Sequence, residues 1–148
     1  MKIAITAVVV IVFLALALFL FWPMSFAPPN DLPLTVTFLS LNTTQSVSAT
    51  VSTDYVVLPD TETFAEINEI LNRHSFRRTL LTFTGGTSMA GHDLGFMFLW
   101  YSDEYMISFS GSGHVEINSR IYHIGRSDVR DIMDEVRSVL TDRESYRQ

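Results

Sequence analysis

Hydrophobic residues follow two different patterns along this chain of 148 residues. From Ile3 to Trp22 they run without a break except at Thr6, and an α-helix needs about 20 such residues to cross the hydrocarbon layer of a bilayer. After residue 30, apolar and polar positions alternate instead. The first pattern predicts a transmembrane helix, and the second predicts a folded domain.

The residues that flank the apolar run indicate its orientation in the membrane and whether it is cleaved. Lys2 precedes the run and no cation follows it closely, so the N-terminus is expected in the cytoplasm and the rest of the chain outside a single-pass cell-membrane helix. Small residues around Ala27 resemble a signal-peptidase site, so a form secreted after cleavage there stays open. The length of the run and the proline at position 28 favour the uncleaved helix.

These features divide the chain into three parts. We expect residues 1–27 to form the N-terminal transmembrane anchor, residues 28–33 a proline-rich linker, and residues 34–148 one extracytoplasmic domain.

The region after the linker begins with alternation of period two. Apolar residues occupy every second position over residues 34–38 and again over 47–51, with hydroxyl-bearing residues between many of them. This pattern predicts a β-hairpin with one apolar and one polar face. A short third strand is expected over residues 55–58.

Two segments have helical periodicity instead. Apolar residues form one stripe over residues 61–74 and again over 127–140, which predicts two amphipathic helices. Thr63 and Glu66 have the spacing of a capping box, and the first helix should end near His74.

Short apolar runs separated by turn residues predict a meander. Its strands are expected over residues 79–83, 96–101, 105–109, 114–117 and 121–124. The run FMFLWY over 96–101 is apolar at both parities, which is typical of a central strand covered on both faces. We therefore expect Phe96, Phe98 and Trp100 in the core.

Together these elements predict an α+β fold. One N-terminal transmembrane helix is followed by an antiparallel sheet, made of the hairpin and the meander, with two helices packed on one face. The opposite face of the sheet is left open in this arrangement.

The composition of the chain excludes several kinds of site and partner. The absence of cysteine excludes a disulfide scaffold, a lipoprotein lipobox and thiolate metal sites. A net charge of −6 argues against binding to nucleic acid. None of the four histidines has metal-ligand spacing, and although His114 and His123 should approach each other on neighbouring strands, no third ligand is indicated. We predict neither a metal nor another cofactor.

One short motif suggests catalysis. The sequence GTSMA, residues 86–90, resembles the segment around the nucleophilic serine of subtilisin-like proteases. The acid and base patterns that precede this segment in that family are missing here, and a serine needs both partners. We interpret the match as accidental and predict no catalytic residue. A hydrolase that uses Ser88 or His92 is the remotest alternative.

Candidate binding residues lie in two groups. The residues Arg73, His74, Arg77 and Arg78 form a basic cluster in an otherwise acidic domain, and His92 and Asp93 lie in a glycine-rich loop. Arginine side chains in a cluster suit the recognition of anions. Cations at the end of a helix also stabilise its dipole, so the basic cluster has a purely structural interpretation as well.

The order of anchor, hairpin, helix, meander and closing helix also carries a resemblance. With TETFAEINEILN and YMISFSGSGHVEINSRIYHIG, the chain resembles small membrane-anchored extracytoplasmic domains of unassigned function from Gram-positive bacteria. The resemblance implies a topology and assigns no residue a role.

We therefore expect a non-catalytic protein-interaction or accessory domain. Its expected partners are the lipid bilayer, through residues 3–22, and another membrane or envelope protein; association with further copies of the chain stays open. The alternative is a module that binds a small ligand or an envelope polymer through the open sheet face or the basic cluster.

Overall fold

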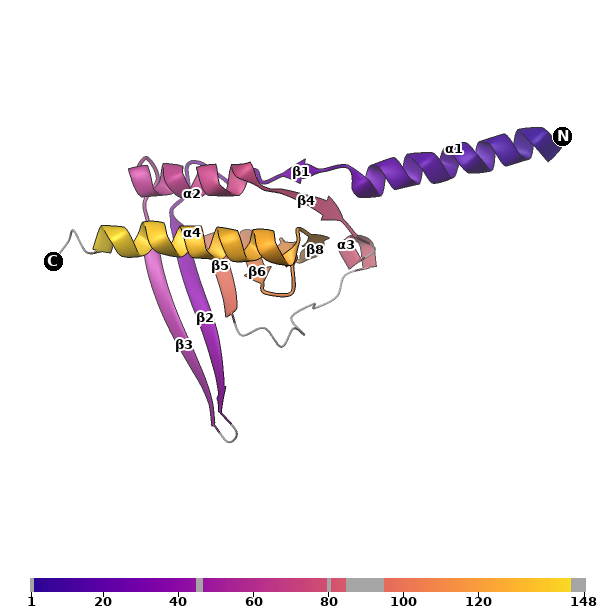
Figure 1. The fold of residues 1–148 in the computed structure, drawn as a ribbon. Coiled ribbons are helices and arrows are strands. Elements are labelled where there is room, and N and C mark those ends of the chain that lie inside the picture. Colours follow the sequence, from indigo (N-terminus) through magenta and orange to yellow (C-terminus); the bar gives the residue numbers. More distant parts are fainter. Residues whose placement is uncertain (1, 45–46, 80, 85–94, 145–148) are drawn as a thin grey trace.

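The computed structural model describes residues 2–44, 47–79, 81–84 and 95–144. Within these residues four helices accompany one eight-stranded sheet in which the paired strands are antiparallel (Figure 1). The helices are α1 (Lys2–Phe21), α2 (Glu62–Arg73), α3 (Leu81–Thr84) and α4 (Arg126–Glu144). The strands are β1 (Met24–Ser25), β2 (Leu34–Thr44), β3 (Val47–Val57), β4 (Ser75–Arg78), β5 (Gly95–Ser102), β6 (Tyr105–Ser110), β7 (His114–Ile117) and β8 (Arg120–His123). The α+β class is confirmed.

The predicted transmembrane helix over residues 3–22 is contradicted. Among the described residues, no helix combines the length and the apolar character needed to cross a membrane. The predicted fold class is therefore wrong in its first element.

The sheet has one face covered by helices, as predicted. Helices α2 and α4 lie side by side across it (Figure 1), and the alternate residues Met97, Leu99 and Tyr101 of β5 belong to the core between the layers. Phe26, just after β1, is buried in the same core. The strand order β1-β4-β8-β7-β6-β5-β2-β3 places the meander in the centre of the sheet.

The hairpin is longer than its alternation predicted. Strands β2 and β3 pair continuously from Leu34 opposite Val57 to Thr44 opposite Val47. Residues 55–57 are therefore the end of β3, and the predicted separate third strand does not form. Tyr55 lies opposite Val36, and its ring meets Phe38 edge-on with centroids 6.2 Å apart.

The predicted strand over residues 79–83 is also wrong. The strand comes earlier, as β4, and the chain then turns into α3. Phe76 anchors β4 because its ring packs against Phe26 and Tyr122, with centroids 4.8 and 4.9 Å apart. The turn is closed by Thr82, whose hydroxyl accepts a hydrogen bond from the Thr79 amide at 2.9 Å.

The two predicted amphipathic helices form, with small changes at their ends. Helix α2 is capped by Thr61 instead of Thr63, because the Thr61 hydroxyl accepts a hydrogen bond from the Phe64 amide at 3.2 Å. The helix ends at Arg73, with His74 as its C-cap in extended conformation. This agrees with the predicted end.

Candidate functional site

The fold divides the predicted basic cluster into two parts. At the end of α2, Arg73 Nη2 lies 2.5 Å from Glu135 Oε2, and His74 Nδ1 lies 3.7 Å from Asp128 Oδ1. Both acids belong to α4. This half of the cluster therefore joins the two helices, and both of its side chains face acidic side chains of α4.

The other half of the cluster lies at the N-terminal helix. The guanidinium carbon of Arg78 is 4.3 Å from the centroid of the Phe19 ring, and Arg78 Nη1 donates a hydrogen bond to the Phe19 carbonyl oxygen at 3.2 Å. Arg77 is exposed and lies opposite His123 in the register of β4 and β8. The other predicted binding residues, His92 and Asp93, lie outside the described residues, as does Ser88.

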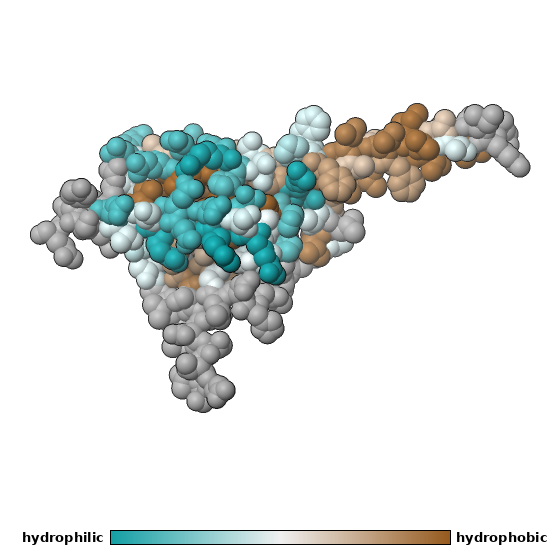
Figure 2. Space-filling view, in the orientation of Figure 1, coloured by the Kyte–Doolittle hydropathy of each residue, from teal (hydrophilic) through white to brown (hydrophobic). Residues whose placement is uncertain are grey.

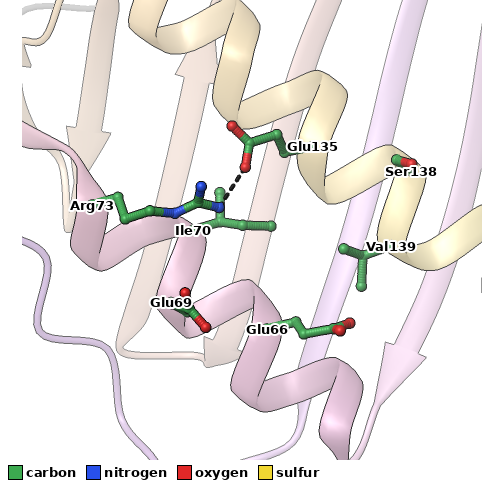
Figure 3. A pocket seen from close by; sticks show the side chains of 7 residues that line it. All are labelled: Glu66, Glu69, Ile70, Arg73, Glu135, Ser138 and Val139. Carbon is green, nitrogen blue, oxygen red and sulfur yellow. Dashed lines mark hydrogen bonds and ion pairs between the residues drawn. The ribbon is translucent and has the colours of Figure 1, made fainter.

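A shallow hollow of about 310 Å³ lies in the seam between α2 and α4. Figure 3 shows Arg73 reaching across it to Glu135, with Glu66 and Glu69 along the α2 side and Val139 on α4. Three carboxylates and one guanidinium make this seam acidic. The ion pair across the seam fixes one helix against the other, which gives the hollow a structural explanation.

The predicted approach of His114 and His123 is confirmed, since their ring centroids are 5.5 Å apart. The Ser112 hydroxyl lies 3.2 Å from His114 Nδ1 and 2.6 Å from the Ser110 hydroxyl. Burial, and secondly the neighbouring His123, lowers the pKa of His114. Among the described residues there is no group of three potential metal-ligating side chains. The hydroxyl and imidazole chain stabilises the turn between β6 and β7.

The sheet face opposite the helices carries a row of aromatic rings on β5. The centroids of Phe96 and Phe98 are 6.4 Å apart and those of Phe98 and Trp100 are 6.1 Å apart, with interplanar angles of 27° and 22°. Phe96 is buried, but 43% of Trp100 is exposed. The prediction that this strand is covered on both faces is therefore wrong at the Trp100 end, because α2 and α4 cover only the Met97 and Leu99 side.

The strands beside β5 extend this row into a patch. In the sheet register, Thr35 lies between Val56 on β3 and Trp100 on β5, and Trp100 lies opposite Met106 on β6. Val56 is 70% exposed, and Thr35 and Met106 are half-buried. We call Val56, Thr35, Trp100 and Met106 the tryptophan patch.

The aromatic row could not be placed on the open face from sequence. All six residues of the run 96–101 are apolar, so there is no alternation of apolar and polar residues to show which of them face the helices. The period-two signal in the neighbouring strand was available, because Thr35 and Thr37 alternate with apolar residues. Their partners across the sheet, Trp100 and Phe98, lie on the same polar side.

A second group of exposed apolar side chains lies at the other end of the domain. Trp22, Leu81 and Phe83 are exposed there, whereas the exposed Leu58 directly follows β3 and lies elsewhere. The Phe83 ring lies 6.0 Å from the Phe19 ring, so α3 is adjacent to the end of α1. Figure 2 shows the apolar surface of α1 continuing onto the neighbouring part of the domain, whereas the surface over α2 and α4 is mainly hydrophilic.

Comparison with protein-family models, with curated proteins and with solved structures gives no match for this chain. The described part of the chain presents two exposed apolar surfaces, one on the open sheet face and one beside α1.

Proposed function

We propose that this chain is a non-catalytic interaction domain that is held at a lipid surface by α1 and binds another protein through the tryptophan patch. One observation supports the binding role above the others: Trp100 and Val56, which lie in one row across the sheet face opposite α2 and α4 with Thr35 between them, are 43% and 70% exposed. Tryptophan is enriched among residues that dominate protein interfaces, because it buries a large rigid surface at low entropic cost.

The composition of the patch supports a protein partner. Its centre is apolar, and half-buried Thr35 supplies a hydroxyl that can be satisfied across an interface. Asp54 on β3 and Glu116 on β7 lie further out in the neighbouring row. An apolar centre with a polar rim is the usual anatomy of a protein interface.

The lipid contact is supported by the surface of α1. Its described side chains are apolar on every side except at Thr6, and most are exposed. Figure 2 shows this apolar surface on the face turned to the viewer. Burying one large aliphatic side chain contributes about 1.5 to 3 kcal/mol. The acyl layer of a lipid surface can cover these exposed side chains.

Site-specific photo-crosslinking tests the protein-binding role. The full chain would carry a photo-crosslinking phenylalanine analogue in place of Val56, or in place of the exposed Arg130 on α4 as the matched control, in cells that produce the protein. We expect one discrete adduct from position 56 and none from position 130. Adding Trp100→Ala should reduce that adduct strongly, because loss of an interface tryptophan costs about 2 kcal/mol or more. Equal adducts from the two positions would exclude a specific patch.

A second candidate is a module that binds an envelope polysaccharide through the same face. The observation that favours it is the nearly parallel pair of rings, Phe98 and Trp100, beside the hydroxyl of Thr37 in the paired strand. Sugar rings stack on aromatic faces, and hydroxyls bind their polar edges. Retention of the full chain on an insoluble cell-wall polysaccharide, lost in Trp100→Ala and kept in Arg130→Gln, would support this candidate over the protein partner.

A further inference from the structure

We propose that the end of the domain beside α1 binds the headgroup layer of an anionic lipid bilayer. The headgroup site consists of Trp22, Arg78, Leu81 and Phe83. This inference rests on the proposed lipid contact of α1 and goes beyond it, because it assigns a role to residues of the folded domain and specifies the charge of the lipid.

Contacts between α1, β4 and α3 fix the headgroup site. Arg78 stacks on Phe19 from one side, with its guanidinium carbon 4.3 Å from the ring centroid, and Phe83 packs against the same ring at 6.0 Å. The helix end is therefore attached to two elements of the domain. Any surface that receives α1 also meets β4 and α3.

The exposed side chains of the site are those that favour the boundary between lipid and water. Trp22 is 64% exposed and Phe83 is 57% exposed, although both are large and aromatic. Trp22 follows directly on the last residue of α1. Tryptophan is enriched where helices leave the hydrocarbon, because its ring has an apolar body and a polar N–H.

The two chain segments that form the site contain no acidic residue, in contrast to the rest of the chain. All sixteen acidic residues lie outside residues 1–30 and 74–84, whereas Arg77 and Arg78 lie within the second of these segments. A chain with net charge −6 is repelled by an anionic surface as a whole, so binding requires a local basic patch. Arginine beside a lipid surface contributes about 1 kcal/mol with anionic headgroups.

A lipid layer fits α1 better than a groove on a protein does. A helix that docks in a protein groove presents one apolar stripe and keeps a polar face. The described part of α1 has no such division, since Thr6 is its one polar side chain between residues 5 and 21. The apolar layer of a lipid surface can receive such a helix without a matching groove, and its charged boundary would lie at Trp22 and Arg78.

Vesicle flotation of the full chain tests the proposal. The two vesicle types are phosphatidylcholine alone and phosphatidylcholine with phosphatidylglycerol. We expect flotation with both types and tighter binding to the anionic one. Arg78→Gln should weaken binding to anionic vesicles about fivefold, which corresponds to about 1 kcal/mol, and leave binding to neutral vesicles unchanged. Arg130→Gln on α4 makes the same charge change and should have no effect.

The outcomes distinguish failure of the lipid contact of α1 from failure of the headgroup site. Failure to float with either vesicle would contradict the lipid contact of α1 itself. Flotation that is equal on both vesicles, or equally reduced by Arg78→Gln and Arg130→Gln, would overturn the headgroup site alone. Arg78→Lys keeps the charge while losing the planar stacking group, so it should retain the preference for anionic lipid. Loss of that preference in Arg78→Lys would also overturn the site.

Discussion

Arg78 holds the N-terminal helix to the domain through a single aromatic residue, Phe19. Its guanidinium group lies over the Phe19 ring and donates a hydrogen bond to the Phe19 carbonyl oxygen at 3.2 Å. The carbonyl belongs to the last turn of α1, where helix carbonyl groups lack intrahelical partners. One side chain thus binds the face of the ring and the end of the helix together.

Replacing Arg78 by alanine should loosen the end of α1. A cation over an aromatic ring at an exposed site contributes about 0.5 to 1 kcal/mol, which corresponds to a twofold to fivefold change in a local equilibrium. The Trp22 amide donates to the Leu18 carbonyl at 2.9 Å, and its hydrogen exchange should accelerate by about that factor. Arg77→Ala is the control, and an equal acceleration in that variant would show that Arg78 is not the link.

Thr61→Ala should destabilise the domain by about 1 kcal/mol, the usual cost of losing a helix N-cap. The Thr61 hydroxyl accepts a hydrogen bond from the Phe64 amide at 3.2 Å and donates one to the Leu58 carbonyl at 2.7 Å. Thr63→Ala lies inside the helix, where alanine is the better helix former, so it should be neutral or slightly stabilising. Urea unfolding measures the free energy of unfolding of both variants. A larger loss of stability in Thr63→Ala than in Thr61→Ala would support the predicted capping box at Thr63 instead.

Ser119→Gly should stabilise the protein by about 0.5 kcal/mol. Asn118 and Ser119 form the turn between β7 and β8 with φ angles of 49° and 64°, and a side chain in this left-handed region costs about 1 kcal/mol or more. Turns with two positive φ angles prefer Asn-Gly. The matched control is Asp103→Gly in the turn between β5 and β6, which has no positive φ angle and should lose stability. Thermal melting should show a higher melting temperature for Ser119→Gly and a lower one for Asp103→Gly than for the wild type.

Stability should decrease below about pH 6.5 through His114. Burial, and secondly the nearby His123, lowers the pKa of His114 in the folded protein, whereas the unfolded chain has the ordinary value of about 6.5. The unfolded state therefore binds more protons as the pH falls from about 6.5 towards the lower folded pKa, and stability is lost in that window. Above pH 6.5 the His114 imidazole is neutral in both the folded and the unfolded state, so His114 causes no further change of stability with pH.

The pH dependence is measured by melting the wild type and two variants between neutral and mildly acidic pH. His114→Gln should flatten the acid side of the profile, while His123→Gln should flatten it only partly, because burial remains the larger cause. If the melting temperature of His114→Gln fell with decreasing pH as steeply as that of the wild type, the loss of stability in acid would belong to another group.

The sequence predicted those elements whose periodicity is set by one buried face. Alternation in 34–38 and the helical stripe in 61–74 each describe a surface with one apolar side, and both elements form as expected. Strand β4 was missed because its four residues, SFRR, include a single apolar position. Phe76 is held there by rings from Phe26 and Tyr122, which are distant in the chain. Contacts of that kind leave no local pattern.

The candidate site was predicted less well than the fold. Neighbouring positions suggested that Arg73, His74, Arg77 and Arg78 would act together, but α2 ends between them and the chain enters β4. Residues two apart on a strand share a face and adjacent ones do not, so closeness in sequence did not become closeness in space. The tryptophan patch arises from four strands, and no local stretch contains it.

The strand order has a consequence for the sequence of folding. Helix α2 carries the chain from β3 at one edge of the sheet to β4 near the other edge, where β4 pairs with the short β1 and with β8. Strands β5 to β8 pair with their neighbours in the chain, so they can assemble quickly from local contacts. During synthesis β4 must wait for Arg120–His123 before it has a full neighbour. The nascent chain therefore completes its sheet only when most of its length has been made.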